Sequence, residues 1–108
     1  MLSPVFTTVD LTAVEDAVGV DVYARGAQYA RQHAVIRMEW NSAEGRLQGT
    51  VRGRTGDFFT ATAYFSSFGG DGLELEHGEC DCPVGFNCKH VVALVLTATE
   101  AERSQPAP

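Results

Sequence analysis

The sequence predicts an α+β fold: a small antiparallel sheet of about four strands, covered by helices, with a cysteine-rich turn that leads into a C-terminal helix. Three observations support this expectation. Apolar residues recur at helical spacing near both ends of the chain, whereas apolar and polar residues alternate in the centre. All three cysteines and one histidine lie between Cys80 and His90. Consecutive strands between helices favour helices packed on an antiparallel sheet.

Length and composition fit a single domain. The chain has 108 residues, of which 44% are hydrophobic, enough for one modest core. We expect the domain to occupy residues 1–103, and the Pro-containing residues 104–108 to be a linker or the end of the chain. No stretch has the apolar length of a membrane span, and the first residues lack the basic and apolar regions of a signal peptide. Reduced thiols fit a cytoplasmic or nuclear protein, of which we take the cytoplasm as the expected location, and we expect no membrane contacts.

Two short helices are expected before the sheet. Residues 11–18 carry apolar side chains at helical spacing, and Thr12 begins a capping-box pattern. Asp21 can cap a second helix that runs to about Gln32. Gly26, inside this helix, costs about 1 kcal/mol relative to Ala. We therefore expect another element to pack closely against Gly26.

The length of the turn between the second and third strands decides whether the apolar residues of both strands lie on the same face of the sheet. A two-residue turn would mix the apolar and polar faces, whereas a three-residue turn pairs Val51 with Phe59 and keeps the apolar faces together. Gly56 then occupies the last, left-handed position, which suits glycine. The opposite face carries Gln48, Thr50, Arg52, Phe58, Thr60, Thr62 and Tyr64.

The remaining elements follow from the same patterns. The first strand, residues 35–40, places Ile36, Met38 and Trp40 on one face. Residues 73–77 alternate again and lead towards the first cysteine. After the cysteine-rich turn, a helix is expected to about Glu102, with a core stripe of Val91, Leu94, Val95 and Ala98.

The cysteine-rich turn has the spacing of a structural zinc site. Its pattern is Cys-x-Cys-x5-Cys-x-His, with candidate ligands Cys80, Cys82, Cys88 and His90. Three thiolates and one imidazole fill the four tetrahedral positions that zinc prefers and leave none for water or substrate. Sulfur-rich ligand sets also favour zinc or copper(I) over magnesium or calcium. The sequence therefore predicts one structural Zn²⁺.

The residues between the ligands favour a tight turn. Pro83 and Gly85 are strong turn formers, and Asn87 is a suitable N-cap for the helix that follows. Positions 88 and 90 are about 200° apart on a helix, so both cannot face one ion from the middle of a helix. We therefore expect Cys88 in the turn or at the helix cap, and His90 in the first helical turn.

Two other interpretations stay open. The cysteines could be buried thiols or form a disulfide, although three is an odd number and Cys80 and Cys82 are too close for an easy bridge. His77, on the preceding strand, could replace one of the four ligands.

The ligand run resembles the SWIM-type zinc finger, whose four ligands match Cys80, Cys82, Cys88 and His90. The local form Cys-x-Cys-Pro-Val-Gly-x-Asn-Cys-Lys-His-Val looks like the bacterial version, often found at the N-terminus of SNF2-type helicases. Upstream, residues 23–29 (YARGAQY) are similar to the aromatic-x-Arg-Gly-x-x-Tyr helix that precedes the finger there. The resemblance covers about residues 21–100. It implies a ββα-like finger at about residues 73–102 that binds DNA or contacts proteins.

An enzyme is the class that the sequence favours least. The predicted zinc has no open position, which a catalytic zinc needs. The sequence has no phosphate-binding glycine loop, no H-E-x-x-H and no recognisable Ser/His/Asp set. We therefore expect no catalysis by this chain alone.

The charge distribution makes nucleic acid one candidate partner. The net charge of −6 argues against a simple basic binder, but six of the eight basic residues lie between Arg25 and Arg54. Arg52 shares its predicted sheet face with Phe58 and Tyr64, a mixture that could neutralise phosphates and stack bases. Alternatively, these aromatic residues pack under the N-terminal helices. The candidate contacts are Arg52, Arg54 and Lys89, with Arg25 and Arg31 as secondary contacts.

A protein partner is the other candidate. Residues 57–81 carry six acidic residues and no Lys or Arg. Such a surface suits docking on a helicase or ATPase domain, or on another protein, without contact to nucleic acid. A third interpretation also stays open, in which the charged residues of both signs form an ordinary solvated surface without a partner.

Overall fold

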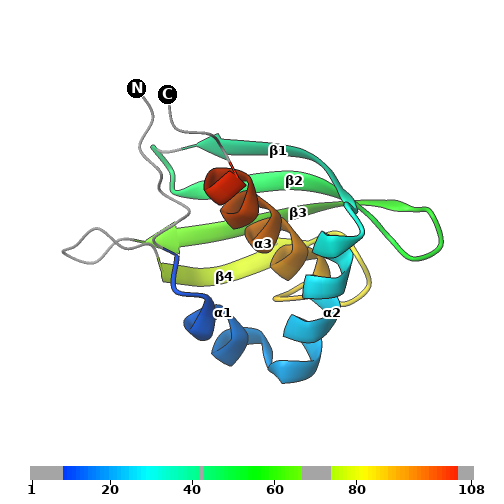
Figure 1. Ribbon diagram of the computed structural model, residues 1–108, viewed down its shortest axis with the longest axis horizontal. Helices are drawn as coiled ribbons and strands as arrows, with labels where there is room; N and C mark the ends of the chain where they lie inside the picture. Colours follow the sequence, from blue (N-terminus) through cyan, green and yellow to red (C-terminus); the bar gives the residue numbers. More distant parts are fainter. Residues whose placement is uncertain (1–8, 42, 67–73, 105–108) are drawn as a thin grey trace.

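The computed structural model of the protein describes residues 9–41, 43–66 and 74–104. Its elements are α1 (Leu11–Val18), α2 (Val20–Arg31), β1 (Val35–Asn41), β2 (Arg46–Arg52), β3 (Phe58–Ser66), β4 (Glu74–Cys80) and α3 (Lys89–Ser104). The four strands form one antiparallel sheet in the order β1-β2-β3-β4 (Figure 1). The predicted α+β class and the order of elements are confirmed. The predicted start of the last strand, residue 73, lies outside the described residues, as do residues 105–108 of the linker predicted at 104–108; Ser104 is the last residue of α3.

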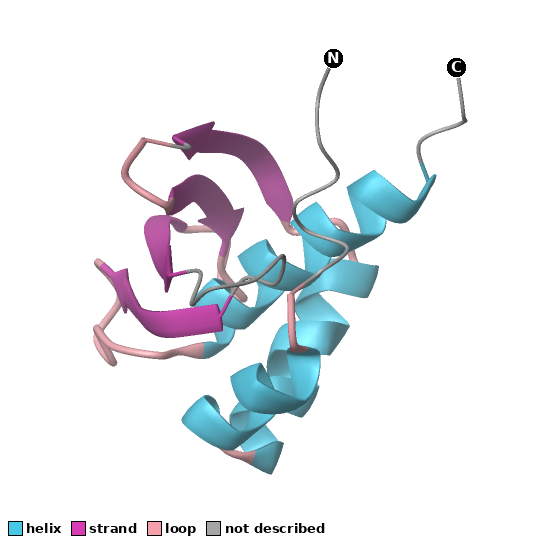
Figure 2. Ribbon diagram, turned by 90° about the vertical axis from the view of Figure 1, so that its left-hand side faces the viewer, coloured by secondary structure: helices cyan, strands magenta, loops and turns pink. Residues whose placement is uncertain are grey.

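The molecule has two layers, with the sheet on one side and all three helices on the other (Figure 2). α3 is the central helix, because it contacts all four strands and also packs along α2. α1 contacts α2 and β4. No helix in the described ranges is both long and apolar enough to span a membrane. The core contains Val14 of α1; Leu47, Val51, Ala61, Ala63 and Phe65 of the sheet; and Val91, Val92, Leu94, Val95 and Ala98 of α3.

The two N-terminal helices begin differently from the sequence-based expectation. Asp10 is the N-cap of α1, and its carboxylate accepts a 3.2 Å hydrogen bond from the backbone N–H of Ala13. Thr12 lies inside the helix, so the predicted capping box is wrong. Gly19, with φ +96°, both ends α1 and precedes α2. Asp21 lies in the first turn of α2 and is not its cap, but its charge there still suits the positive end of the helix.

The close approach predicted at Gly26 is confirmed. Gly26 is the buried residue of α2, and it faces Val92 of α3. A Cβ atom at position 26 would overlap the Val92 side chain and lie 2.9 Å from the carbonyl oxygen of Lys89. The glycine thus lets α2 pack against the start of α3, which is the segment that carries the last ligand.

The predicted turn between β2 and β3 is also confirmed. Val51 pairs with Phe59, so the apolar residues of the two strands share one face. The N–H of Gly53 donates to the carbonyl of Asp57 at 2.6 Å, which closes a turn of three residues. The last of these, Gly56, has φ +94°, the left-handed conformation that was expected.

β1 departs from its predicted alternation at Ile36. The pairing with β2 shifts between Val35 and Arg37, so Ile36 lies at an irregularity of the ladder and is 55% exposed. Met38 and Trp40 keep the predicted face, opposite core-facing positions of β2. The expectation that all three apolar residues share one face is therefore wrong for Ile36. A bulge moves one residue out of the alternation, and the sequence pattern does not show it.

The face of the sheet opposite α3 is not covered by the helices. Phe58 is 59% exposed there. Tyr64 is half-buried because its ring stacks on His77 of β4, with centroids 4.7 Å apart. The interpretation that these aromatic residues pack beneath the N-terminal helices is therefore wrong.

Candidate metal centre

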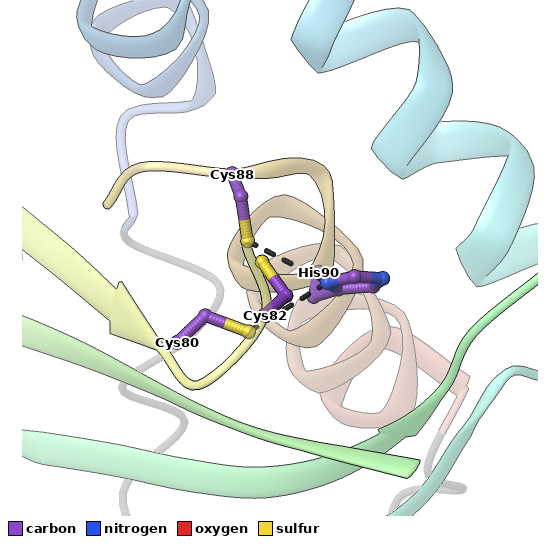
Figure 3. A group of neighbouring side chains, drawn as sticks. All are labelled: Cys80, Cys82, Cys88 and His90. Carbon is purple, nitrogen blue, oxygen red and sulfur yellow. Dashed lines mark hydrogen bonds between the residues drawn. The ribbon is translucent and has the colours of Figure 1, made fainter. Parts of the chain in front are cut away.

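Three cysteines and one histidine converge at the start of α3. One ligand atom from each of Cys80, Cys82, Cys88 and His90 lies within 4.8 Å of the others. Figure 3 shows the three sulfur atoms pointing towards each other and towards the near edge of the His90 ring. His90 Nδ1 is 3.6 Å from the sulfur of Cys80 and 3.6 Å from that of Cys88. No disulfide joins these thiols, which contradicts the disulfide interpretation.

The four candidate ligands come from three segments: the end of β4, the turn that follows and the start of α3. Cys80 is the last residue of β4, Cys82 follows in the turn, and His90 is the second residue of α3. The carbonyl of Cys88 accepts from the N–H groups of Val91 and Val92 at 3.1 and 3.2 Å, so Cys88 caps α3. The predicted positions of Cys88 before the helix and His90 in its first turn are confirmed.

Two polar side chains tie the ligand turn to the sheet. The carboxylate of Asp81 accepts from the N–H of Thr60 at 2.9 Å, while the Asp81 N–H donates to the Thr60 carbonyl at 3.3 Å. Asn87 makes the same double contact with Gly78 of β4. Asn87 is therefore not the N-cap of α3, which corrects the sequence-based expectation. Neither contact has a signal in the sequence, because both depend on how the turn folds back.

The His90 ring is fixed by two aromatic neighbours. It stacks on Phe59, with centroids 4.8 Å apart, and meets Tyr29 edge to face at 5.4 Å. Only 4% of His90 is exposed. With Nδ1 turned to the sulfur atoms, Nε2 points away from the cluster (Figure 3). Among the described residues, no group forms a hydrogen bond with Nε2.

The thiols Cys80 and Cys88 differ in acidity. The pKa of Cys88 is lowered to about 3, chiefly because the Cys80 side chain hydrogen-bonds to it, with a smaller contribution from His90. The pKa of Cys80 is raised, first by the same hydrogen bond and then by burial. The two shifts have opposite directions, so Cys88 loses its proton more readily than Cys80 does. A thiolate is the form that binds a metal ion.

His77 is not part of the cluster. It lies on β4, with its ring between Tyr64 at 4.7 Å and Phe86 at 5.9 Å. Its Nε2 is 3.3 Å from a carboxylate oxygen of Glu79. The alternative in which His77 replaces one of the ligands is therefore wrong.

The comparisons with known proteins agree with this geometry. The family model of the SWIM zinc finger matches residues 64–98, about a third of the chain, and this span contains all four residues of the cluster. No curated protein and no solved structure matches the chain. The similarity to the SWIM finger and the cluster together fit one structural zinc ion, as predicted. Such an ion would cross-link β4, the turn and α3, which ties the sheet to the central helix.

Four of the five predicted nucleic-acid contacts line one hollow of about 640 Å³. They come from separate parts of the chain: Arg25 from α2, Arg52 from the end of β2, Arg54 from the following turn, and Lys89 from the start of α3. We call this the cationic hollow. Arg31, at the end of α2, does not line it. No acidic residue is among the lining residues that the structure describes.

Lys89 is held in place at the edge of the hollow. Its ammonium lies over the ring of Tyr29, 5.6 Å from the centroid, in a cation–π contact. Because Lys89 stands between Cys88 and His90, the metal centre also fixes the backbone position of this lysine.

Proposed function

We propose that this chain is a non-catalytic, zinc-stabilised module that binds nucleic acid through the cationic hollow. The observation that carries the proposal is the convergence of Arg25, Arg52, Arg54 and Lys89 on one hollow without an acidic neighbour in its lining. In a chain of net charge −6, such a local excess of positive charge is not explained by composition. Phosphate groups are the ligands that clustered Arg and Lys side chains favour.

Two further features support a phosphate ligand. The hollow includes the first residue of α3, where the helix macrodipole adds partial positive charge. The acidic residues of β4 that the structure describes, Glu74, Glu76 and Glu79, do not line the hollow. Their repulsion of a phosphate bound there is therefore reduced by distance and salt.

The role of zinc in this proposal is structural. A bound ion would supply a fixed cross-link among its four ligands and no open coordination position. The chain's own residues would do the binding: Lys89 is placed by the ligand run and Arg25 by the packing of α2 on α3. By its resemblance to the bacterial SWIM fingers, we propose that the module is accessory to an SNF2-type ATPase.

Fluorescence-anisotropy titrations of labelled oligonucleotides test this function. The variant Arg52→Ala/Arg54→Ala removes two charges from the hollow, and Arg37→Ala/Arg46→Ala removes two charges outside it. Each lost phosphate contact lowers the slope of log affinity against log salt by about one unit, so we expect a decrease of about two for the first variant and none for the second. Equal binding by both variants would overturn the proposal.

A protein-docking function is the second candidate. The exposed acidic residues of β4 and the net charge of −6 favour it. Under this hypothesis the wild-type protein binds no oligonucleotide even at low salt, and an interaction with a basic protein surface takes the place of phosphate contacts. The same titrations decide between the two candidates.

A further inference from the structure

A second hollow, of about 380 Å³, lies between the cationic hollow and the metal centre. Both hollows are lined by Arg25, Tyr29, Arg54 and Lys89, so they are parts of one depression. We call the second part the apolar lobe. It is also lined by Val22, Phe59, Pro83, Val84 and three of the predicted zinc ligands, Cys82, Cys88 and His90.

The walls of the apolar lobe suit a flat, mostly apolar group. Phe59 and Tyr29 contribute aromatic surface, and Val22 and Val84 contribute aliphatic surface. Val84 is 69% exposed, although it is a large aliphatic residue next to a buried cluster. Of the residues that the structure describes, none that lines the lobe is acidic.

Charge decides which part of a ligand enters the lobe. Zn²⁺ with three thiolates carries a net charge of −1, and Cys82 and Cys88 line the lobe. These thiolates make the lobe less favourable for a phosphate than the cationic hollow, whereas they do not repel an uncharged ring. Arg52 lines only the cationic hollow, whereas Arg25, Arg54 and Lys89 line both parts. The cationic hollow therefore has the larger number of positive side chains and no thiolate in its lining, and a phosphate is favoured there.

His90 adds a hydrogen-bond donor to this environment. When Nδ1 binds zinc, the proton of the neutral imidazole is on Nε2. A metal-bound histidine usually donates this N–H to a neighbouring acceptor, yet no described residue accepts it here. Nε2 is covered in the present arrangement, so an acceptor on a ligand would reach it only if the packing around the His90 ring changed.

We propose that the depression binds one unpaired nucleotide of a single strand, with its base in the apolar lobe and its phosphate in the cationic hollow. This inference rests on the proposed nucleic-acid function and specifies its ligand. A base inside a duplex has its faces and its pairing edge occupied by other bases, so it cannot enter the lobe. In a single strand, a base exposes its faces and its pairing edge. Stacking of a base on aromatic side chains tolerates any sequence.

Three labelled ligands of equal length, about 12 nucleotides, test the inference in anisotropy titrations: a single strand, a strand with abasic sugars, and a blunt duplex. The single strand is expected to bind at least about fivefold more tightly than the abasic strand, because only the first can fill the lobe. The duplex offers phosphates but no unpaired base, so its affinity is expected to come from phosphate contacts alone.

Two matched valine variants locate the base. Val84→Asn changes the wall of the lobe, whereas Val20→Asn changes a valine of similar exposure, 68% against 69%, that lines neither hollow. Val84→Asn should reduce the preference for the single strand over the abasic strand, and Val20→Asn should not. The zinc content of both variants should equal that of the wild type.

The outcomes separate this inference from the proposed function. Binding of all three ligands with equal affinity overturns the unpaired nucleotide and leaves the phosphate-binding module intact. A base preference that Val84→Asn does not reduce also overturns the inference, because the base then binds elsewhere. The absence of binding to any ligand at low salt overturns both proposals.

Discussion

Asn87 and Gly78 are joined by two hydrogen bonds: the Asn87 N–H donates to the Gly78 carbonyl at 2.9 Å, and the Gly78 N–H donates to the Asn87 side-chain oxygen at 2.7 Å. On Gly78, a Cβ atom would overlap Val91 of α3. Gly78 is therefore held between the ligand turn and the central helix. Asn87 has φ +47°, a conformation that Asn tolerates better than most residues.

Asn87→Ala should weaken zinc binding about tenfold and destabilise the fold by about 1–3 kcal/mol, because the buried N–H of Gly78 loses its acceptor and the turn loses an anchor. Competition with a chromophoric zinc chelator measures the affinity, and denaturant unfolding measures the stability. Asn41→Ala, which removes a side-chain acceptor for Glu44 in the β1–β2 turn, serves as the control. Unchanged zinc affinity in Asn87→Ala would show that the turn does not depend on this anchor.

The fit of Gly26 against Val92 predicts an unfavourable Gly26→Ala substitution. Helix propensity alone favours alanine by about 1 kcal/mol. The overlap with Val92 and with the Lys89 carbonyl opposes this gain and should cost about 1–3 kcal/mol or more, since α3 cannot retreat from the sheet.

A double-mutant cycle distinguishes the overlap from a general effect on α2. Val92→Ala removes Cγ1, one of the two Val92 atoms that a Cβ at position 26 would overlap, and leaves the Cβ of residue 92. Gly26→Ala/Val92→Ala should therefore be more stable than the sum of the single variants predicts, by at least about 0.5 kcal/mol. Additive free energies of unfolding would show that the two helices do not meet at these residues.

The sequence predicted what depends on local pattern. Alternation and turn length were enough to pair Val51 with Phe59, and the ligand spacing was enough to bring Cys80 and His90 together. The bulge at Ile36 escaped prediction because one inserted residue changes the register without changing the composition.

The surroundings of the site could not be predicted in the same way. Asn87 has a side chain equally suited to a helix cap and to a backbone contact, and only the path of the turn decides between them. The convergence of Arg25 with Arg52 requires α2 to pack beside the end of β2, which is a tertiary arrangement. The apolar lobe likewise exists only because the turn, α2 and β3 meet.

The central position of α3 predicts where the fold is most sensitive. Leu94 has no exposed surface, and it contacts the position where Gly49 of β2 lacks a side chain. Leu94→Ala should destabilise the zinc-loaded protein by about 2–5 kcal/mol through lost burial and a residual cavity. Leu96→Ala, on the same helix but only partly buried, should cost less. Equal losses in denaturant unfolding would contradict the assignment of the core face.

Removal of zinc should weaken the whole fold. Cys82→Ser takes away one of the four ligands, and the variant should contain far less than one zinc ion per chain in metal analysis of the purified protein. Because the ion joins the sheet to α3, we also expect loss of much of the cooperative unfolding transition. A folded wild-type sample with a zinc content near zero would contradict the structural role of the ion.

Zinc affinity should rise with pH. The lowered pKa of Cys88 means that this thiol has already lost its proton near neutral pH, so its contribution to the fold is kept above its ordinary pKa and is lost only as the pH falls towards about 3. The pKa of Cys80 is shifted in the opposite direction: it is raised, so Cys80 keeps its proton through the neutral range. Zinc must displace that proton, so binding releases a proton from Cys80 and none from Cys88.

Chelator competition at several values between about pH 6 and about pH 8 measures this dependence, and calorimetry in buffers of different ionisation enthalpy counts the protons released. We expect tighter binding at each higher pH and a release of fewer protons than the three thiols would supply together. Cys88→Ser removes the thiol that is already ionised, and Cys80 keeps its proton in this range even without that partner, because burial also raises its pKa. The weaker zinc binding that remains should therefore depend on pH about as steeply as in the wild type. An affinity that is constant across this range, or the release of one proton for every thiol, would show that Cys80 and Cys88 do not share a proton in the metal-free fold.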